Sequence, residues 1–110
     1  MLAVSVYVPS RDAEGQRLAT QDVRTAVDDT IKLLSSRFGG CTVTTGYGAW
    51  VNGQADIIRE RVRIVTSFAD DAQVDESVIV DHARNLRQRL QQEAVMYTIQ
   101  PAGQVGFIGA

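Results

Sequence analysis

The sequence predicts an α+β fold in which two helices pack on one face of a four-stranded antiparallel sheet. Three observations support this prediction. Two segments have apolar residues at helical spacing along one side only, a long hairpin pattern lies between them, and short alternating apolar segments flank the pair. A chain of 110 residues has the usual size of one domain, so we expect residues 1–110 to form a single one.

Composition and charge narrow the classes of function. The formal net charge is −2, so overall electrostatics predict neither nucleic-acid affinity nor adhesion to anionic membranes. Cys41 has no second cysteine for a disulfide, and His82 is the single histidine, which leaves too few soft ligands for a zinc site. No apolar run approaches the roughly 20 residues of a membrane span. We assign no metal and no cofactor, and we expect a soluble cytoplasmic protein.

The first strand and the first helix follow from apolar periodicity. The strand has apolar residues at every second position: Leu2, Val4, Val6 and Val8. A polar loop over residues 9–19 leads to Thr20, the expected N-cap of a helix. This helix has apolar residues three or four positions apart: Val23, Val27, Ile31, Leu34 and Phe38. Gly39-Gly40 ends it, because glycine adopts the left-handed C-cap conformation without steric cost.

A long hairpin over residues 41–68 carries most of the structural information. Asn52-Gly53 has the residue types of a two-residue type I′ turn. With that turn Val51 faces Gln54, and the helix side holds four pairing residues: Thr45, Tyr47, Ile58 and Glu60. The opposite face holds Gly46, Trp50 and three alternating arginines that we call the arginine row: Arg59, Arg61 and Arg63. A longer loop over residues 51–56 or a bulge would exchange the faces, so the register stays open.

The second helix and the last strand complete the pattern. Asp75 is the expected N-cap, and Val74 and Ile79 have the spacing of a hydrophobic staple. The apolar stripe of this helix is Ile79, Ala83, Leu86 and Leu90. A strand follows over residues 94–99, and residues 105–108 can form a short fifth strand.

The resulting order, βαββαβ with two one-sided helices, is that of the ferredoxin-like or split βαβ fold. We expect the helices to cover one face of the sheet, which carries Val4, Val6, Val43, Val62 and Ile64. The other face is left open by this chain, to meet water, another subunit or a ligand.

Several short motifs carry a resemblance to a known group of proteins. They are Arg37-Phe38-Gly39-Gly40-Cys41-Thr42-Val43, Gly46-Tyr47-Gly48-Ala49-Trp50, Glu60, and Gln92-Glu93-Ala94-Val95. Together they resemble small uncharacterised bacterial ferredoxin-like proteins, over most of the chain from Leu2 to Ile108. The resemblance implies the fold and neither a reaction nor a cofactor. Members often carry an export segment, which is not evident here, so their location is not carried over.

The arginine row and Trp50 are the first candidates for a binding site. Arg59, Arg61 and Arg63 alternate along one strand and can bind a carboxylate or a phosphate bidentately. In the simpler alternative, the arginine stems cover an exposed sheet face or pair with acidic side chains of a second subunit. Trp50 can stack on a ligand, anchor an interface, or be an ordinary partly buried side chain.

Glu60 is the second candidate, because the expected register points it toward the helices. A buried carboxylate is costly unless it is paired or hydrogen-bonded, and such groups also serve as catalytic acids or bases. Thr45 and an arginine from a helix can satisfy it structurally. For His82, a packed or half-exposed position is the commoner case, and for Cys41 a buried inert thiol.

Two functional hypotheses remain. In the first, the chain is a non-enzymatic domain that self-associates through its open sheet face as a homo-oligomer, in the simplest case a dimer, and binds a small anionic molecule there. We assign it no catalytic residue; Tyr47, Trp50 and Glu60 join the arginine row as ligand or interface residues. In the second, it is a small enzyme of the dimeric α+β barrel type, with Glu60 as acid or base and with Tyr47 or His82 in the pocket. We expect neither a membrane nor a nucleic acid as partner, because strand three offers arginines where RNA-binding sheets use aromatics.

Overall fold

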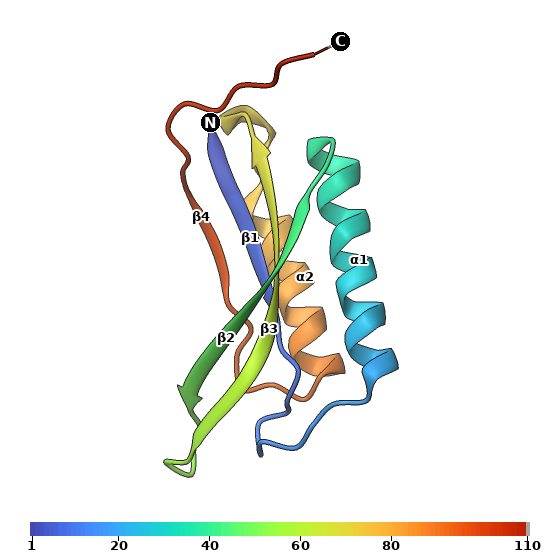
Figure 1. Cartoon of the computed structure of the whole chain (residues 1–110), viewed down its shortest axis with the longest axis vertical. Helices are drawn as coiled ribbons and strands as arrows, with labels where there is room; N and C mark the ends of the chain where they lie inside the picture. Colours follow the sequence, from blue (N-terminus) through green and yellow to red (C-terminus); the bar gives the residue numbers. More distant parts are fainter. Residues whose placement is uncertain (110) are drawn as a thin grey trace.

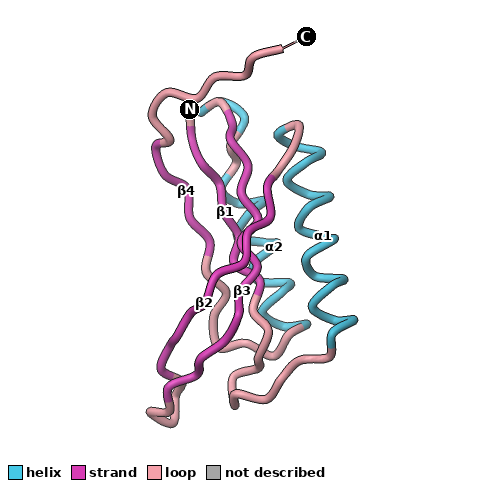
Figure 2. Tube along the Cα trace, in the orientation of Figure 1, coloured by secondary structure: helices cyan, strands magenta, loops and turns pink. Residues whose placement is uncertain are grey.

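The computed structural model describes residues 1–109 and has the predicted architecture (Figure 1). The main elements are β1 (Leu2–Val8), α1 (Thr20–Phe38), β2 (Thr42–Val51), β3 (Ile57–Ala69), α2 (Glu76–Arg89) and β4 (Tyr97–Pro101), with a 3-10 turn over Asp71–Gln73. All neighbouring strands are antiparallel, in the order β2-β3-β1-β4. Both helices lie on one side of this sheet (Figure 2). The ferredoxin-like α+β fold class is therefore confirmed.

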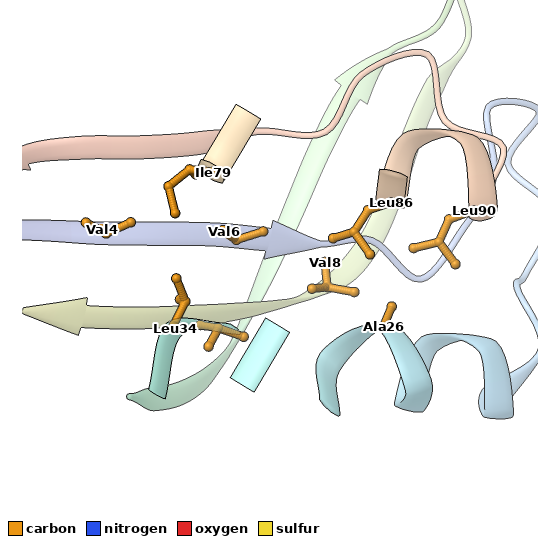
Figure 3. Close-up of a cluster of buried hydrophobic side chains, with 9 residues drawn as sticks. Val4, Val6, Val8, Ala26, Leu34, Ile79, Leu86 and Leu90 are labelled. Carbon is orange, nitrogen blue, oxygen red and sulfur yellow. The ribbon is translucent and has the colours of Figure 1, made fainter. Parts of the chain in front are cut away.

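The core lies between β1, the centre of β3 and both helices. Val4, Val6 and Val8 have no exposed surface, and they meet Leu34 of α1 and Leu86 of α2 (Figure 3). The predicted stripe of α2 is confirmed, since all four of its members are buried. In α1 the most buried line lies one step beside the predicted stripe: Ala26, Thr30 and Leu34. The other predicted members are therefore half-buried, and several line a cleft beside the helix: Val23, Val27 and Ile31.

Most of the predicted helix ends are confirmed. The Asp75 side chain accepts a hydrogen bond from the Ser77 N–H at 3.0 Å and caps α2. Gly39 ends α1 in the left-handed conformation, with φ of 90°. Thr20 is instead the first residue of α1, and Ala19 takes the cap position without a side-chain bond. The last strand begins three residues later than predicted, at Tyr97 instead of residue 94, and residues 102–109 form no fifth strand.

The turn of the hairpin differs from the predicted two-residue type. It is a loop over residues 52–56, closed by Asn52. The Asn52 N–H donates to the Asp56 carbonyl, and its Oδ1 accepts from the N–H groups of Gln54 and Asp56, each at 3.0 Å. Its Nδ2 also donates to the carbonyl of Ala13, in the loop before α1, at 3.1 Å. An asparagine side chain that bonds its own backbone is a common way to close such a turn.

This loop shifts β3 against β2 by an odd number of residues. Val51 pairs with Ile57 rather than with Gln54, a shift of three positions. Because side chains alternate between the two faces of a strand, an odd shift moves every side chain of β3 to the other face. Tyr47 now pairs with Arg61, and Trp50 with Ile58.

The prediction of which β3 side chains lie on each face of the sheet is therefore wrong. The arginine row Arg59, Arg61 and Arg63 lies on the helix side, where Arg63 pairs with Val8. Glu60 lies on the open side with Trp50. Val62 and Ile64 also face the open side, and Val65 takes their place in the core.

The chain is strongly elongated, with principal extents of 48 × 25 × 24 Å. The far ends of β2 and β3 extend beyond both helices, beside the loop that precedes α1 (Figures 1 and 2). The helices therefore cover only part of the helix-side face of the hairpin. The arginine row lies on the part that they leave uncovered.

Candidate functional site

A cleft of about 910 Å³ lies between α1 and the hairpin. Its walls come from α1, from the strands β2 and β3, and from the loop before α1. Six of its lining residues are arginines: Arg11, Arg17, Arg24, Arg59, Arg61 and Arg63. Its two acidic lining residues are Asp28 and Glu60. A chain with a net negative charge thus concentrates positive charge in one place, and we call this place the arginine cleft.

The arginines of this cleft have no carboxylate partner among residues 1–109. The ion pairs of residues 1–109 lie outside this cleft. They join the N-terminus to Asp71, Arg84 to Asp81 and Arg89 to Asp29. Arg63 donates to the Thr45 hydroxyl at 2.6 Å, and Arg11 donates to the Gly15 carbonyl at 3.0 Å. Hydrogen bonds to neutral groups leave the positive charges uncompensated, so the cleft attracts anions.

The row on β3 has a regular spacing. Alternate residues of a strand lie about 6.6–6.8 Å apart, so the three guanidinium groups present repeated fork-shaped donors along one line. Tyr47 is the cross-strand partner of Arg61 on the same face and is 74% exposed. The cleft therefore combines donors for anionic groups with an exposed aromatic ring.

Glu60 is buried but fully engaged. Its side chain is 5% exposed, and its Oε1 accepts from the backbone N–H groups of Ser10 and Arg11 at 2.8 and 3.0 Å. Its Oε2 accepts from Trp50 Nε1 at 2.7 Å. The partners expected from the sequence, Thr45 and a helix arginine, are therefore not the ones found.

These contacts give Glu60 a positioning role. The carboxylate ties the start of the loop before α1 to the hairpin, and Ser10 adds a bond from its hydroxyl to the Arg61 carbonyl at 2.6 Å. Gln92 holds the same loop from the other side, because its Nε2 donates to the Arg11 carbonyl at 2.6 Å. Arg11 of the loop is thereby placed against the arginine row of β3.

A second cleft of about 510 Å³ lies on the open sheet face, and we call it the apolar cleft. Its lining is mainly apolar and includes Tyr7, Trp50, Val62, Ile64 and Met96. Gly46, expected beside Arg59, belongs to this cleft, and a Cβ there would lie 3.2 Å from the Ile64 Cδ1 atom. The half-buried Trp50 thus combines a polar anchor on Glu60 with an apolar surface in this cleft.

His82 lies between the two helices and lines neither cleft. Thr30 donates to the Ala26 carbonyl and accepts from His82 Nε2, both at 2.8 Å. Burial lowers the pKa of His82, the nearby Arg89 lowers it further, and Asp29 opposes this shift. His82 is therefore a link between the helices, and the structure does not bring it to Tyr47 and Glu60.

Cys41 is half-buried and accepts from the Ser35 hydroxyl at 3.4 Å. In the described part of the chain, no three histidine, cysteine or acidic side chains come together as metal ligands would. No helix of that part is long and apolar enough to cross a membrane.

Three of the six cleft arginines were not singled out from the sequence: Arg11, Arg17 and Arg24. Arg24 stands next to Val23 at the border of the helical stripe, which is the one local signal that it faces a neighbouring element. Arg11 and Arg17 lie in an irregular loop, where no periodicity indicates direction. Their backbones form an isolated antiparallel β-bridge with each other, and the contacts of Glu60 and Gln92 hold Arg11.

Comparisons with known proteins identify a family and related folds. A family model described as "Protein of unknown function (DUF3574)" matches residues 6–107, and no curated protein matches the sequence. A phage SAM lyase solved in complex with S-methyl-5′-thioadenosine is 13% identical, with a TM-score of 0.65 over 90% of this chain and 79% of that chain. A phage SAM lyase in the apo state is 17% identical, with a TM-score of 0.57 over 90% and 78% of the two chains. At these identities the likeness shows a shared fold.

Proposed function

The chain belongs to the DUF3574 family, whose description assigns no activity, and we propose that it binds a small anionic molecule in the arginine cleft. The observation that carries this proposal is the convergence of six arginines on one cleft, none of them paired with a carboxylate among the described residues. A ligand with phosphate or carboxylate groups supplies the missing negative charge.

Physical chemistry favours such a ligand over a purely structural role. A planar guanidinium donates two parallel hydrogen bonds to a carboxylate or a phosphate, and these charge-assisted bonds are about twice as strong as neutral ones. The cleft volume of about 910 Å³ lies within the range of small-molecule sites, roughly 300–1,000 Å³. Arginines that merely cover a surface do not need to converge from a loop, a helix and a strand.

The proposal is tested by calorimetry and thermal shift with inorganic phosphate, pyrophosphate, AMP and a dicarboxylate. We expect at least one of these anions to raise the melting temperature and to bind more weakly at high salt. Arg61→Gln is expected to weaken binding about 10-fold, because it removes one charge-assisted contact.

Arg84→Gln is the matched control, because Arg84 is an exposed arginine of α2 outside the cleft. It is expected to leave the affinity unchanged. Equal binding by the two variants, or no binding of any anion to the wild-type chain, would refute the proposal.

We propose in addition that the chain self-associates through its open sheet face. The helices leave this face uncovered, and two large apolar side chains there are exposed: Phe68 at 40% and Met96 at 55%. Large apolar side chains that are exposed on an uncovered sheet face favour a protein contact. Sedimentation velocity of the full chain over a range of concentrations tests this part, and a strict monomer at high concentration contradicts it.

An enzymatic function is the second candidate, and the likeness to phage SAM lyase favours it. In this hypothesis Glu60 acts as acid or base on a small organic substrate. Incubation with SAM, followed by chromatography for S-methyl-5′-thioadenosine, tests the lyase form of the hypothesis. Product formation that is lost in Glu60→Gln supports it, and no product above the protein-free control rejects SAM as the substrate.

A further inference from the structure

The segment over residues 102–109 presents apolar side chains with no cover. Phe107 is 81% exposed and Ile108 is fully exposed, although both are large and apolar. The segment leaves the sheet beside the N-terminus, where the Ala102 N–H donates to the Met1 carbonyl at 3.0 Å, and it then runs away from the domain (Figures 1 and 2). The family match extends to residue 107, so most of this segment belongs to the family's shared sequence.

The apolar cleft lies toward the other end of the same sheet. It is lined by the late part of β2, by the early part of β3 and by residues 92–96 before β4. The hairpin loop lies at the opposite end of the molecule from the segment over residues 102–109 (Figure 1). An apolar donor segment and an apolar acceptor cleft thus lie at opposite ends of one elongated domain.

We propose that two copies of this chain pair through their open sheet faces and that residues 105–108 of each copy occupy the apolar cleft of the other. This inference rests on the self-association part of the proposed function. A twofold axis across the strands places the N-terminal end of one sheet against the hairpin end of its partner, so both contacts form at once and the assembly closes as a dimer.

The dimensions agree with this arrangement. An extended chain spans about 3.3–3.6 Å per residue, so residues 102–108 reach roughly 25 Å. That reach is about half of the 48 Å long axis, enough to pass from one end of the domain onto the facing half of a partner. The cleft volume of about 510 Å³ lies within the range of small-molecule sites. The side chains of Phe107 and Ile108 together are comparable to a small ligand.

Two complementary variants test the contact in trans. Phe107→Asp puts a charge on the donor segment and cannot disturb the core, because Phe107 is exposed. Gly48→Leu fills the acceptor cleft: a Cβ at Gly48 would lie 3.9 Å from the nearest Val62 methyl carbon, and no positive φ is needed there. Gln104→Ala, an exposed polar change in the same segment, is the control.

Sedimentation equilibrium of each full-length variant, alone and mixed, gives the readout. We expect each single variant to raise the dimer dissociation constant about 100-fold. The twofold repeats each change, so Phe107→Asp removes two buried aromatic side chains per dimer, and Gly48→Leu fills the two clefts that hold them. An equal mixture of the two variants is expected to regain dimers, since the intact segment of one copy meets the intact cleft of the other. Gln104→Ala is expected to match the wild-type chain.

The outcomes separate the two levels of the proposal. A monomeric wild-type chain overturns the self-association itself. A wild-type dimer that Phe107→Asp leaves unchanged overturns the exchange of segments and leaves the sheet-face contact standing. Two monomeric variants that stay monomeric when mixed also overturn the exchange, because the mixture contains an intact segment and an intact cleft that do not bind each other. Circular dichroism of Gly48→Leu checks its fold, and if it is unfolded, Phe107→Asp alone decides.

Discussion

The two faces of the β2–β3 hairpin differ in chemistry although they share the same strands. The helix-side face carries Arg59, Arg61, Arg63 and Tyr47, and the open face carries Glu60 with Trp50 and an apolar cleft. On the open face the polar groups are satisfied by internal hydrogen bonds. On the helix side the charges stay uncompensated within the described chain. The comparison teaches that the contacts of the open face stabilise the fold, whereas the unpaired arginines of the helix-side face are the observation that supports the proposed anion site.

The largest expected effect comes from breaking the open face at Glu60. Glu60→Ala leaves the N–H groups of Ser10, Arg11 and Trp50 without their acceptor. We expect the free energy of unfolding to fall by about 3 kcal/mol, because unsatisfied buried donors cost about 1–3 kcal/mol each and water replaces part of the loss. Urea denaturation measures this change. Glu14→Ala, an exposed change in the same loop, should stay within about 0.5 kcal/mol of the wild-type chain.

The next effect concerns the loop over residues 52–56, which sets the register of β3 against β2. Asn52→Ala removes two bonds within the loop and the bond to Ala13, and Asn52 is a buried residue. We expect a loss of about 2 kcal/mol in the free energy of unfolding, measured in urea. Gln54→Ala is the control, because that exposed side chain forms no bond that the loop needs. Equal stabilities of the two variants would show that Asn52 does not hold the register.

A smaller effect of opposite sign is expected on the helix side. Without a ligand, Arg61→Gln removes repulsion within the arginine cleft, so the variant should be more stable than the wild-type chain by about 0.5 kcal/mol at low salt. The gain should vanish at high salt, because mobile ions screen the same repulsion. Arg84→Gln, which removes a partner of Asp81, should show no gain. A loss of stability in Arg61→Gln would mean that the arginine row serves the fold.

The smallest effect concerns the helix layer behind the arginine cleft. Burial holds the pKa of His82 below its ordinary value of 6.5, so the unfolded chain binds a proton more readily than the folded one. Its contribution to stability is therefore present above pH 6.5 and decreases as the pH falls through that value toward the lower folded-state pKa. Thermal melts of wild type and His82→Gln between about pH 7.5 and pH 5, the range in which histidine changes its charge, measure this contribution. Parallel pH profiles of the two proteins would contradict this expectation.

Much of the fold could be predicted because its signals are local. The alternation of Val4, Val6 and Val8, the stripe of α2, and the caps at Gly39 and Asp75 each depend on a few neighbouring residues. Such patterns state which side of an element is buried. Arg59, Arg61, Arg63 and Glu60 were also singled out as candidates from the sequence, because arginines on alternate positions and a glutamate among apolar residues are visible there.

The faces were predicted wrongly because their assignment depends on one loop. Asn52-Gly53 is typical of a two-residue turn, yet Asn52 bonds Ala13, which lies far away in the sequence, and closes a longer loop. The position of Arg11 beside the arginine row also depends on contacts between distant segments, since Glu60 and Gln92 hold the loop before α1. None of these contacts has a local signature.

The sequence by itself thus determined the elements, their order and the ferredoxin-like fold, because periodicity and caps are short-range properties. Only the tertiary structure decided which face of the hairpin carries the arginines and which carries Glu60 and Trp50. The physical reason is that side chains of a strand alternate, so a shift by an odd number of residues exchanges the faces. That shift is set by the loop that Asn52 closes, and this loop is bonded to Ala13, a residue that it meets only in the folded chain.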